Sequence, residues 1–210
     1  MKTMINNLIY SILLLATIGA ESQVTFESLI INAKKSELPY NSFSKSADST
    51  MARVLDGQQK QYVLSKLRTA EQLIVFDKQY PQIGSPDCRN CLDSASNDEI
   101  ALITYFKWGN DFLVYLTLDQ DHKKRGILAS VSTKGEWISW FVSDISLWAN
   151  DIINLSRVTE IDESGNININ ENYFDGKNER HSHQAMLISG RTPEGKYISF
   201  GKFYITTKTN

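Results

Sequence analysis

Residues 100–119 read IALITYFKWGNDFLVYLTLD, two apolar segments that meet at Gly109-Asn110-Asp111. Both segments are rich in the β-branched and aromatic residues that favour extended strands. A short connector that contains a glycine is typical of a tight β-hairpin. The stretch therefore predicts two antiparallel strands, Ile100–Trp108 and Phe112–Asp119.

Three more hairpins of the same kind follow along the chain. Their turns are Lys134-Gly135, Glu163-Ser164-Gly165 and Pro193-Glu194-Gly195. The strands expected around these turns are Gly126–Thr133 with Glu136–Ser143, Ile153–Asp162 with Asn166–Phe174, and Gln184–Arg191 with Lys196–Thr206. Eight strands joined by short turns predict an antiparallel meander, and Leu73–Phe76 is a candidate first strand before it.

Before residue 72 the apolar period is 3.6 residues, which indicates helices. One helix begins near Phe26 and ends at Leu38-Pro39-Tyr40-Asn41. A second runs from Asp48 as N-cap to Gly57 as the glycine after its last turn, and a third covers Gln58–Arg68. The residues expected to face inward are Phe26, Leu29, Ile30 and Ala33 in the first helix, and Tyr62, Val63 and Leu67 in the third. Helices this short need a surface to pack on.

The fold class that follows is α+β, with short N-terminal helices packed on a C-terminal antiparallel β-meander of about eight strands. An open sheet covered by helices is the preferred arrangement, and a sandwich or a sheet that closes toward a barrel is the alternative. The 210 residues suit a single globular domain over residues 23–210, with a helical lead-in at 23–70 and the meander at 71–210. A net charge of −2 argues against a nucleic-acid partner, which needs a basic surface.

Residues 1–22 have the features of a signal peptide. Lys2 precedes the apolar run Leu8–Ile18, which is shorter than the ~20 residues that cross a bilayer. Small residues at Ala20 and Ser22 favour cleavage after Ser22, with cleavage after Ala20 or an uncleaved anchor as alternatives. No cysteine ends the run, so we expect an exported, periplasmic or extracellular protein without a lipid anchor or a transmembrane segment in its mature chain.

Behind this export signal and the helical lead-in, two segments carry a resemblance. Phe112–Asp119 (FLVYLTLD) and the turn and strand Lys134–Ile138 (KGEWI) resemble uncharacterised secreted proteins of Gram-negative bacteria. The resemblance covers a minor part of the chain. It implies an exported globular protein and no particular activity.

The cysteines Cys88 and Cys91 form one C-x-x-C motif in SPDCRNCLDS. In an oxidising compartment the preferred interpretation is a local disulfide that closes a short loop. A redox site and half of a zinc site are the alternatives. The motif lacks the aromatic context of a thioredoxin-like site, and the sequence contains no second C-x-x-C.

His181 and His183 are candidate metal ligands, because residues two apart on a strand share one face. Glu179 could add a carboxylate, although no third ligand is secure. The alternative is a polar hairpin loop, since FDGKNERHSH is hydrophilic throughout. The basic triplet Lys123-Lys124-Arg125 could contact an anionic glycan or lipid headgroup, and a solvated hairpin end is its simpler interpretation. No cofactor is expected.

Tryptophans are the side chains most suggestive of recognition. Trp108, Trp137, Trp140 and Trp148 lie close together in the sequence. Trp137 and Trp140 cannot both face one side of a regular strand, so one of them could lie exposed and stack on a sugar ring or anchor a protein. In the alternative, the rings fill the core between sheet and helices.

The sequence contains no nucleophile elbow, no H-E-x-x-H motif and no phosphate-binding glycine loop. We therefore expect a non-catalytic binding or interaction module that uses Trp137, Trp140 and Trp108 on an aromatic-rich sheet surface, with a protein or glycan as partner. The competing function is a secreted hydrolase or metal-dependent enzyme using His181, His183 and nearby acids. An exposed aromatic strip would favour the first function, and a concave pocket with converging titratable groups the second.

Overall fold

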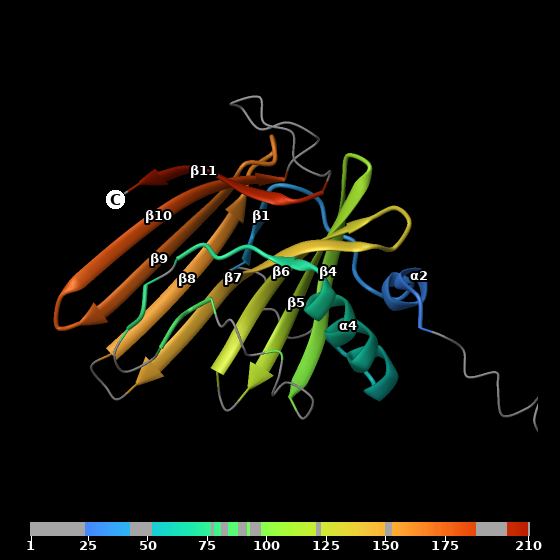
Figure 1. The fold of residues 1–210 in the computed structure, drawn as a ribbon, viewed down its shortest axis with the longest axis horizontal. Coiled ribbons are helices and arrows are strands. Elements are labelled where there is room, and N and C mark those ends of the chain that lie inside the picture. The colour runs from blue at the N-terminus through green and yellow to red at the C-terminus, as the bar shows by residue number, and fades with distance from the viewer. Residues whose placement is uncertain are drawn as a thin grey trace, which may run out of the picture.

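The computed structural model of the protein describes residues 24–42, 52–76, 78–80, 84–87, 92, 98–120, 123–149, 153–187 and 201–209, except the side chains of 120, 123, 147–149, 153 and 207–209. Within these ranges the chain forms eleven strands, all in one sheet, and two helices (Figure 1). The predicted signal peptide lies outside the described residues.

Eight long strands make up most of the sheet, and strands that follow one another in the chain lie next to each other. They are β4 (Glu99–Trp108), β5 (Asp111–Gln120), β6 (Lys123–Ser132), β7 (Trp137–Ala149), β8 (Ile153–Ile161), β9 (Ile167–Asp175), β10 (Asn178–Leu187) and β11 (Phe203–Thr209). Every pairing between them is antiparallel. The predicted antiparallel sheet is therefore confirmed.

Three two-residue strands complete the described sheet. β1 (Tyr40–Asn41) pairs with β8, and β2 (Arg53–Val54) pairs with β4. β3 (Glu71–Gln72) pairs with β7 in the parallel sense. The strand expected at Leu73–Phe76 is wrong, because β3 ends at Gln72 and residues 73–76 form no strand. β2 and β11 stand at opposite ends of the strand order. The sheet of the described residues is therefore open, and the closure toward a barrel that the sequence allowed is not formed.

β10 begins at Asn178, six positions before the strand start expected at Gln184. Gly176, with a φ of 87°, makes the turn between β9 and β10. The polar sequence after it pairs with β9 throughout, from Asn178 opposite Phe174 to Ala185 opposite Ile167. Hydrophilic side chains on this strand do not prevent pairing, because the ladder uses backbone groups. The turn expected at Pro193-Glu194-Gly195 lies outside the described residues.

The helices are α2 (Phe26–Ile30) and α4 (Gly57–Thr69), and both lie beside β4–β6 in Figure 1. The third predicted helix is confirmed, with Val63, Leu64 and Leu67 buried. The predicted role of Gly57 is wrong, because Gly57 is the first residue of α4. Asp56 is the N-cap, and its carboxylate accepts the Gln59 N–H at 2.9 Å, which satisfies a free donor of the first turn. Residues 53–54 are a strand, and Asp48 lies outside the described residues.

The sheet has an apolar core on each side. The first lies between the helices and β4–β7 and includes Leu29, Leu64, Leu116 and Val142. The second joins side chains of β4–β7 to side chains of β8–β11, among them the rings of Phe141 and Phe203, whose centroids are 4.9 Å apart. Because strands distant in the order meet in this second core, the sheet curls around it.

Two turn glycines provide a matched test of this packing. Gly165 and Gly176 both have φ above 80°, which costs other residues about 1 kcal/mol. A Cβ on Gly165 would lie 1.6 Å from Cη2 of Trp108, whereas nothing lies within 4 Å of a Cβ on Gly176. We expect Gly165→Ala to lower the free energy of unfolding by about 2–4 kcal/mol and Gly176→Ala by about 1 kcal/mol. If urea denaturation gave the two variants equal losses of unfolding free energy, the close fit of the Trp108 indole against Gly165 would be contradicted.

Candidate functional site

Trp137 and Trp140 lie in the core between β7 and α4, with exposed fractions of 8% and 2%. The register with β6 shifts between Ser130 and Val131, which pair with Ser139 and Trp137, so Ile138 is an extra residue. Such a bulge places both indoles on one face, which a regular strand forbids. The Trp140 indole N–H donates to the carbonyl of Leu67 at 2.9 Å. These two rings hold α4 on the sheet, and neither of them belongs to an exposed aromatic strip.

The other two tryptophans lie apart from this pair. Trp108 ends β4, is half-buried, and packs against the second core beside Gly165. Trp148 lies on β7, and its side chain is outside the described residues. The three tryptophans proposed for binding are therefore divided between the two sides of the sheet.

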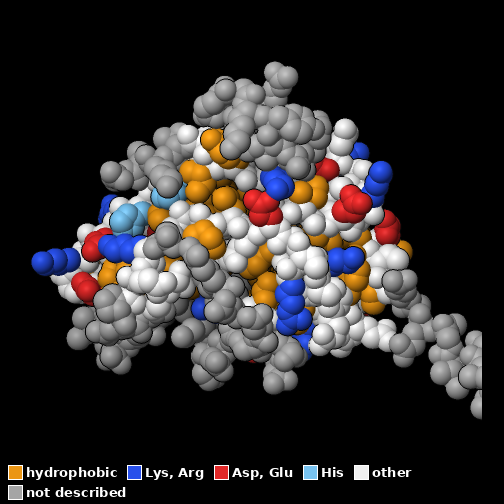
Figure 2. Space-filling model, in the orientation of Figure 1, with side chains coloured by type: hydrophobic (Ala, Val, Ile, Leu, Met, Phe, Trp, Pro, Cys, Tyr) orange, Lys and Arg blue, Asp and Glu red, His pale blue; other side chains and the backbone are white. Residues whose placement is uncertain are grey.

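His181 and His183 do share one face of β10, as the spacing predicts. Both rings pack on Phe76, at centroid distances of 5.9 and 4.2 Å. Figure 2 shows histidine side chains at the surface on the side of the molecule where β10 lies. Glu179 Oε2 is 3.6 Å from His181 Nε2 and also pairs with Lys78. The described residues contain no group of three His, Cys, Asp or Glu side chains that could hold a metal ion.

A charged cluster that the sequence analysis missed lies on this same side of β8 and β9. Arg157 is buried and pairs with two buried carboxylates, at 2.8 Å to Asp87 Oδ1 and 2.8 Å to Glu171 Oε2. The hydroxyl of Tyr80 donates to Glu171 Oε1 at 2.6 Å, and the Phe76 N–H donates to Asp87 Oδ2 at 2.7 Å. The cluster is closed to ligands, because its charged side chains are fully buried, and it joins Phe76, Tyr80 and Asp87 to the sheet.

Asp144 is a partly buried acid in the curl of the sheet. Asp144 accepts a hydrogen bond from the Tyr115 hydroxyl at 2.5 Å and one from Ser143 Oγ at 3.1 Å. Burial raises the pKa of Asp144 to about 6, against the opposing effect of these two donors. Burial and the Asp144 charge also raise the pKa of the Tyr115 and Tyr40 hydroxyls. Gly126 provides the space, since a Cβ there would lie 1.4 Å from Asp144 Oδ1.

The other side of β8, β9 and β10 presents a polar surface that we call the amide face. Residues directly opposite on paired strands share a face, so the registers define four rows. The rows are Asn154–Phe174–Asn178, Ser156–Asn172–Arg180, Val158–Asn170–Ser182 and Glu160–Asn168–Gln184. Six of these twelve side chains are amides and two are hydroxyls. The sequence signal for it is NININEN over residues 166–172, where asparagines alternate with inward-facing Ile167, Ile169 and Glu171.

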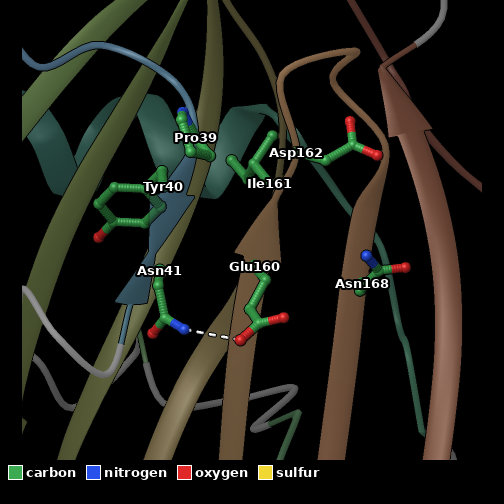
Figure 3. Close-up of a pocket in the computed structure, with 7 residues that line it drawn as sticks. All are labelled: Pro39, Tyr40, Asn41, Glu160, Ile161, Asp162 and Asn168. Carbon is green, nitrogen blue, oxygen red and sulfur yellow. Dashed lines mark hydrogen bonds between the residues drawn. The ribbon is translucent and has the colours of Figure 1, made fainter.

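Two neighbouring depressions lie along the amide face. One, of about 480 Å³, is lined by the two middle rows of the amide face together with Glu171 and His181. The other, of about 520 Å³, is lined by Glu160 and Asn168 together with Asp162, Ile161 and the segment Pro39–Asn41 (Figure 3). In Figure 3 the ring of Tyr40 points away from Glu160 and Asn168, while Asn41 points toward Glu160. The two depressions occupy adjacent rows of one surface.

Some polar groups of the amide face are paired and others are not. Ser182 Oγ donates to Asn170 Oδ1 at 2.7 Å, Gln184 Nε2 to Asn168 Oδ1 at 3.2 Å, and Asn41 Nδ2 to Glu160 Oε1 at 2.7 Å. The Oδ1 atoms of Asn154 and Asn172 are shielded from solvent and have no hydrogen-bond partner. A shielded acceptor without a donor is unfavourable, so a ligand that donates to it gains free energy.

Comparison with known proteins gives no family: no family model, curated protein or solved structure matches the chain. Across the described residues, no helix is long and apolar enough to cross a membrane. Cys88 and Cys91, for which a disulfide was predicted, and His122 lie outside the described residues.

Proposed function

We propose that the protein is a non-catalytic binding module and that the amide face of β8–β10 is its recognition surface for a glycan. The observation that carries this proposal is the concentration of amides and hydroxyls in two adjacent depressions of about 480 and 520 Å³. Their volumes fall in the range of roughly 300–1,000 Å³ typical of small-molecule sites.

The chemistry of the face suits sugar hydroxyls. Each carboxamide both donates and accepts hydrogen bonds, and each sugar hydroxyl does the same. Phe174 lies on this face and is 38% exposed, so its ring is available to the apolar side of a sugar. Phe174 on β9 thus provides the aromatic contact to the ligand, in place of the buried tryptophans of β7.

The competing enzyme function has less support from the described residues. Arg157, Asp87 and Asp144 with its partner Tyr115 line neither depression, and Glu171, which contributes to the lining of one, has its carboxylate paired with Arg157 on the other side of the sheet. His181 contributes to the lining of one depression, but its ring packs on Phe76 on the other side of the sheet. A hydrolytic site needs titratable groups that converge on a substrate.

The proposal predicts that the double variant Asn170→Ala/Asn172→Ala loses glycan affinity. Two lost hydrogen bonds of about 1 kcal/mol each correspond to a ten- to thirtyfold increase in Kd. The measurement is a glycan-array screen of the full chain after export, followed by calorimetric titration of the best ligand.

The matched control is Asn32→Ala, which removes an exposed amide beside α2, far from this face. It should leave Kd unchanged, and all variants should melt within a few degrees of the wild type. Failure of the wild-type protein to bind any glycan, or equal losses in the two variants, would reject the amide face as a glycan site.

A further inference from the structure

We propose that the amide face selects an acidic saccharide, a sugar that carries a carboxylate, and that Arg180 binds this carboxylate. The inference rests on the proposed glycan-binding function and adds the charge class of the ligand. Arg180 lines the 480 Å³ depression and stands in one row with Asn172 and Ser156.

The Arg180 guanidinium has no carboxylate partner among the described side chains. The neighbouring acids are already paired on the other side of the sheet, where Glu179 binds Lys78 and Glu171 binds Arg157. A guanidinium presents a planar fork of donors that matches a carboxylate in a bidentate pair. The group is therefore available to a ligand anion within the depression.

The surroundings of Arg180 suit a carboxylated sugar better than a bare anion. The adjacent Asn172 Oδ1 is shielded and has no donor. A carboxylate cannot supply a donor to this oxygen, whereas a sugar hydroxyl can. A saccharide that carries both groups satisfies Arg180 and Asn172 together.

Charge is distributed unevenly along the amide face, and this sets the orientation in which an acidic ligand binds. Glu160 and Asp162 line the other depression, and Glu160 lies four residues along β8 from Ser156. At about 3.3 Å per residue this separation is roughly 13 Å, the length of two to three sugar units. The carboxylate of the ligand is repelled from the acidic end and attracted to the Arg180 end. Phe174, two residues after Asn172 on β9, provides a ring beside this end.

The test compares uronic-acid oligosaccharides with the same oligosaccharides after reduction of their carboxyl groups. Calorimetry with the wild-type protein should give at least tenfold tighter binding of the acidic form. Arg180→Gln should remove this preference and change the affinity for the neutral form less than twofold, because a hydrogen bond to a charged group is the stronger kind. Arg180→Lys, which keeps the charge without the fork, should retain part of the preference.

Lys177→Gln is the matched control, since it removes an exposed cation from the adjacent β9–β10 turn. It should leave the preference intact. Equal losses in Lys177→Gln and Arg180→Gln would indicate general charge attraction and overturn the proposal. Binding of the neutral form that is as tight as the acidic form, and still weakened by Asn170→Ala/Asn172→Ala, would reject the role of Arg180 and leave the glycan function standing. Absence of binding to either form would reject both.

Discussion

Arg157→Met is expected to lower the free energy of unfolding by about 3–5 kcal/mol, the largest single effect that we predict. Arg157 is the most voluminous of the fully buried side chains in the described chain, and it is the only cation paired with Asp87 and Glu171 there. Methionine fills a similar volume without the charge. Two carboxylates would then remain enclosed without a counter-ion, which is far more unfavourable than the loss of a surface ion pair.

The loss should extend to the segment that the cluster holds. Asp87 accepts two donors from Arg157 and one from the Phe76 backbone, so it joins both ends of the segment Phe76–Asp87 to β8. The guanidinium also covers the Phe76 ring, at 4.8 Å from its centroid, and donates to the carbonyl of Val142 at 2.9 Å. We therefore expect faster amide exchange and proteolysis in this segment of the variant.

Two further variants separate the charge effect from a packing effect. The triple variant Arg157→Met/Asp87→Asn/Glu171→Gln has no buried charge in the cluster, and its amide oxygens still accept from Phe76 and Tyr80. It should recover at least half of the lost stability in urea denaturation. Arg180→Met removes an exposed arginine from β10, two strands away from Arg157, and should change stability by less than about 0.5 kcal/mol. A triple variant as unstable as the single one would show that enclosed charge is not the cause.

Sequence patterns missed this cluster because its members lie far apart in the chain. The hairpins are local, and glycines such as Gly109, Gly135 and Gly165, all with positive φ, mark their turns in the sequence. Asp87 and Arg157 are brought together across 70 positions, and no periodicity connects them. The only local sign is a charged residue at an inward position of β8, between buried Leu155 and Thr159.

The candidate site was only partly predictable for a different reason. Trp137 and Trp140 are expected on opposite faces of a regular strand, but the extra residue Ile138 places both indoles on one face. The asparagine alternation over residues 166–172 is plain in the sequence, but outward-facing polar residues are ordinary on sheets. The amide face becomes a candidate only when the registers place β8 and β10 beside it and reveal shielded acceptors without donors.

Asp144→Asn is expected to stabilise the protein at neutral pH by about 1–3 kcal/mol, an unusual sign for a change at a partly buried, hydrogen-bonded residue. Burial raises the pKa of Asp144 from its ordinary 3.8 to about 6. The folded state therefore binds the proton more tightly than the unfolded state. The stabilisation from protonation is complete below about pH 4 and is lost as the pH rises through about 6. A pKa difference of two units corresponds to about 3 kcal/mol of folding stability, which is lost at pH 7 because Asp144 is then charged.

Asparagine removes this ionisation and keeps most of the local geometry. Its side-chain oxygen can still accept from the Tyr115 hydroxyl and from Ser143 Oγ. The lost attraction to Lys124 and Arg157, and the weaker hydrogen bond to a neutral acceptor, make the gain smaller than the full 3 kcal/mol. The difference in stability between the variant and the wild type should thus grow from near zero at pH 4 to its maximum above pH 7.

Urea denaturation of both proteins at several pH values between 4 and 8 measures this difference. Subtraction is necessary because other groups have the opposite dependence: the hydrogen bond from Lys78 lowers the pKa of Glu179, whose contribution is lost as the pH falls. Asp119→Asn, at an exposed carboxylate of β5, is the control for the substitution itself and should change stability by less than about 0.5 kcal/mol. If Asp144→Asn is less stable than the wild type at pH 7.5, the Tyr115–Asp144 hydrogen bond outweighs the burial of the charge, and Asp144 is a stabilising residue of the curl.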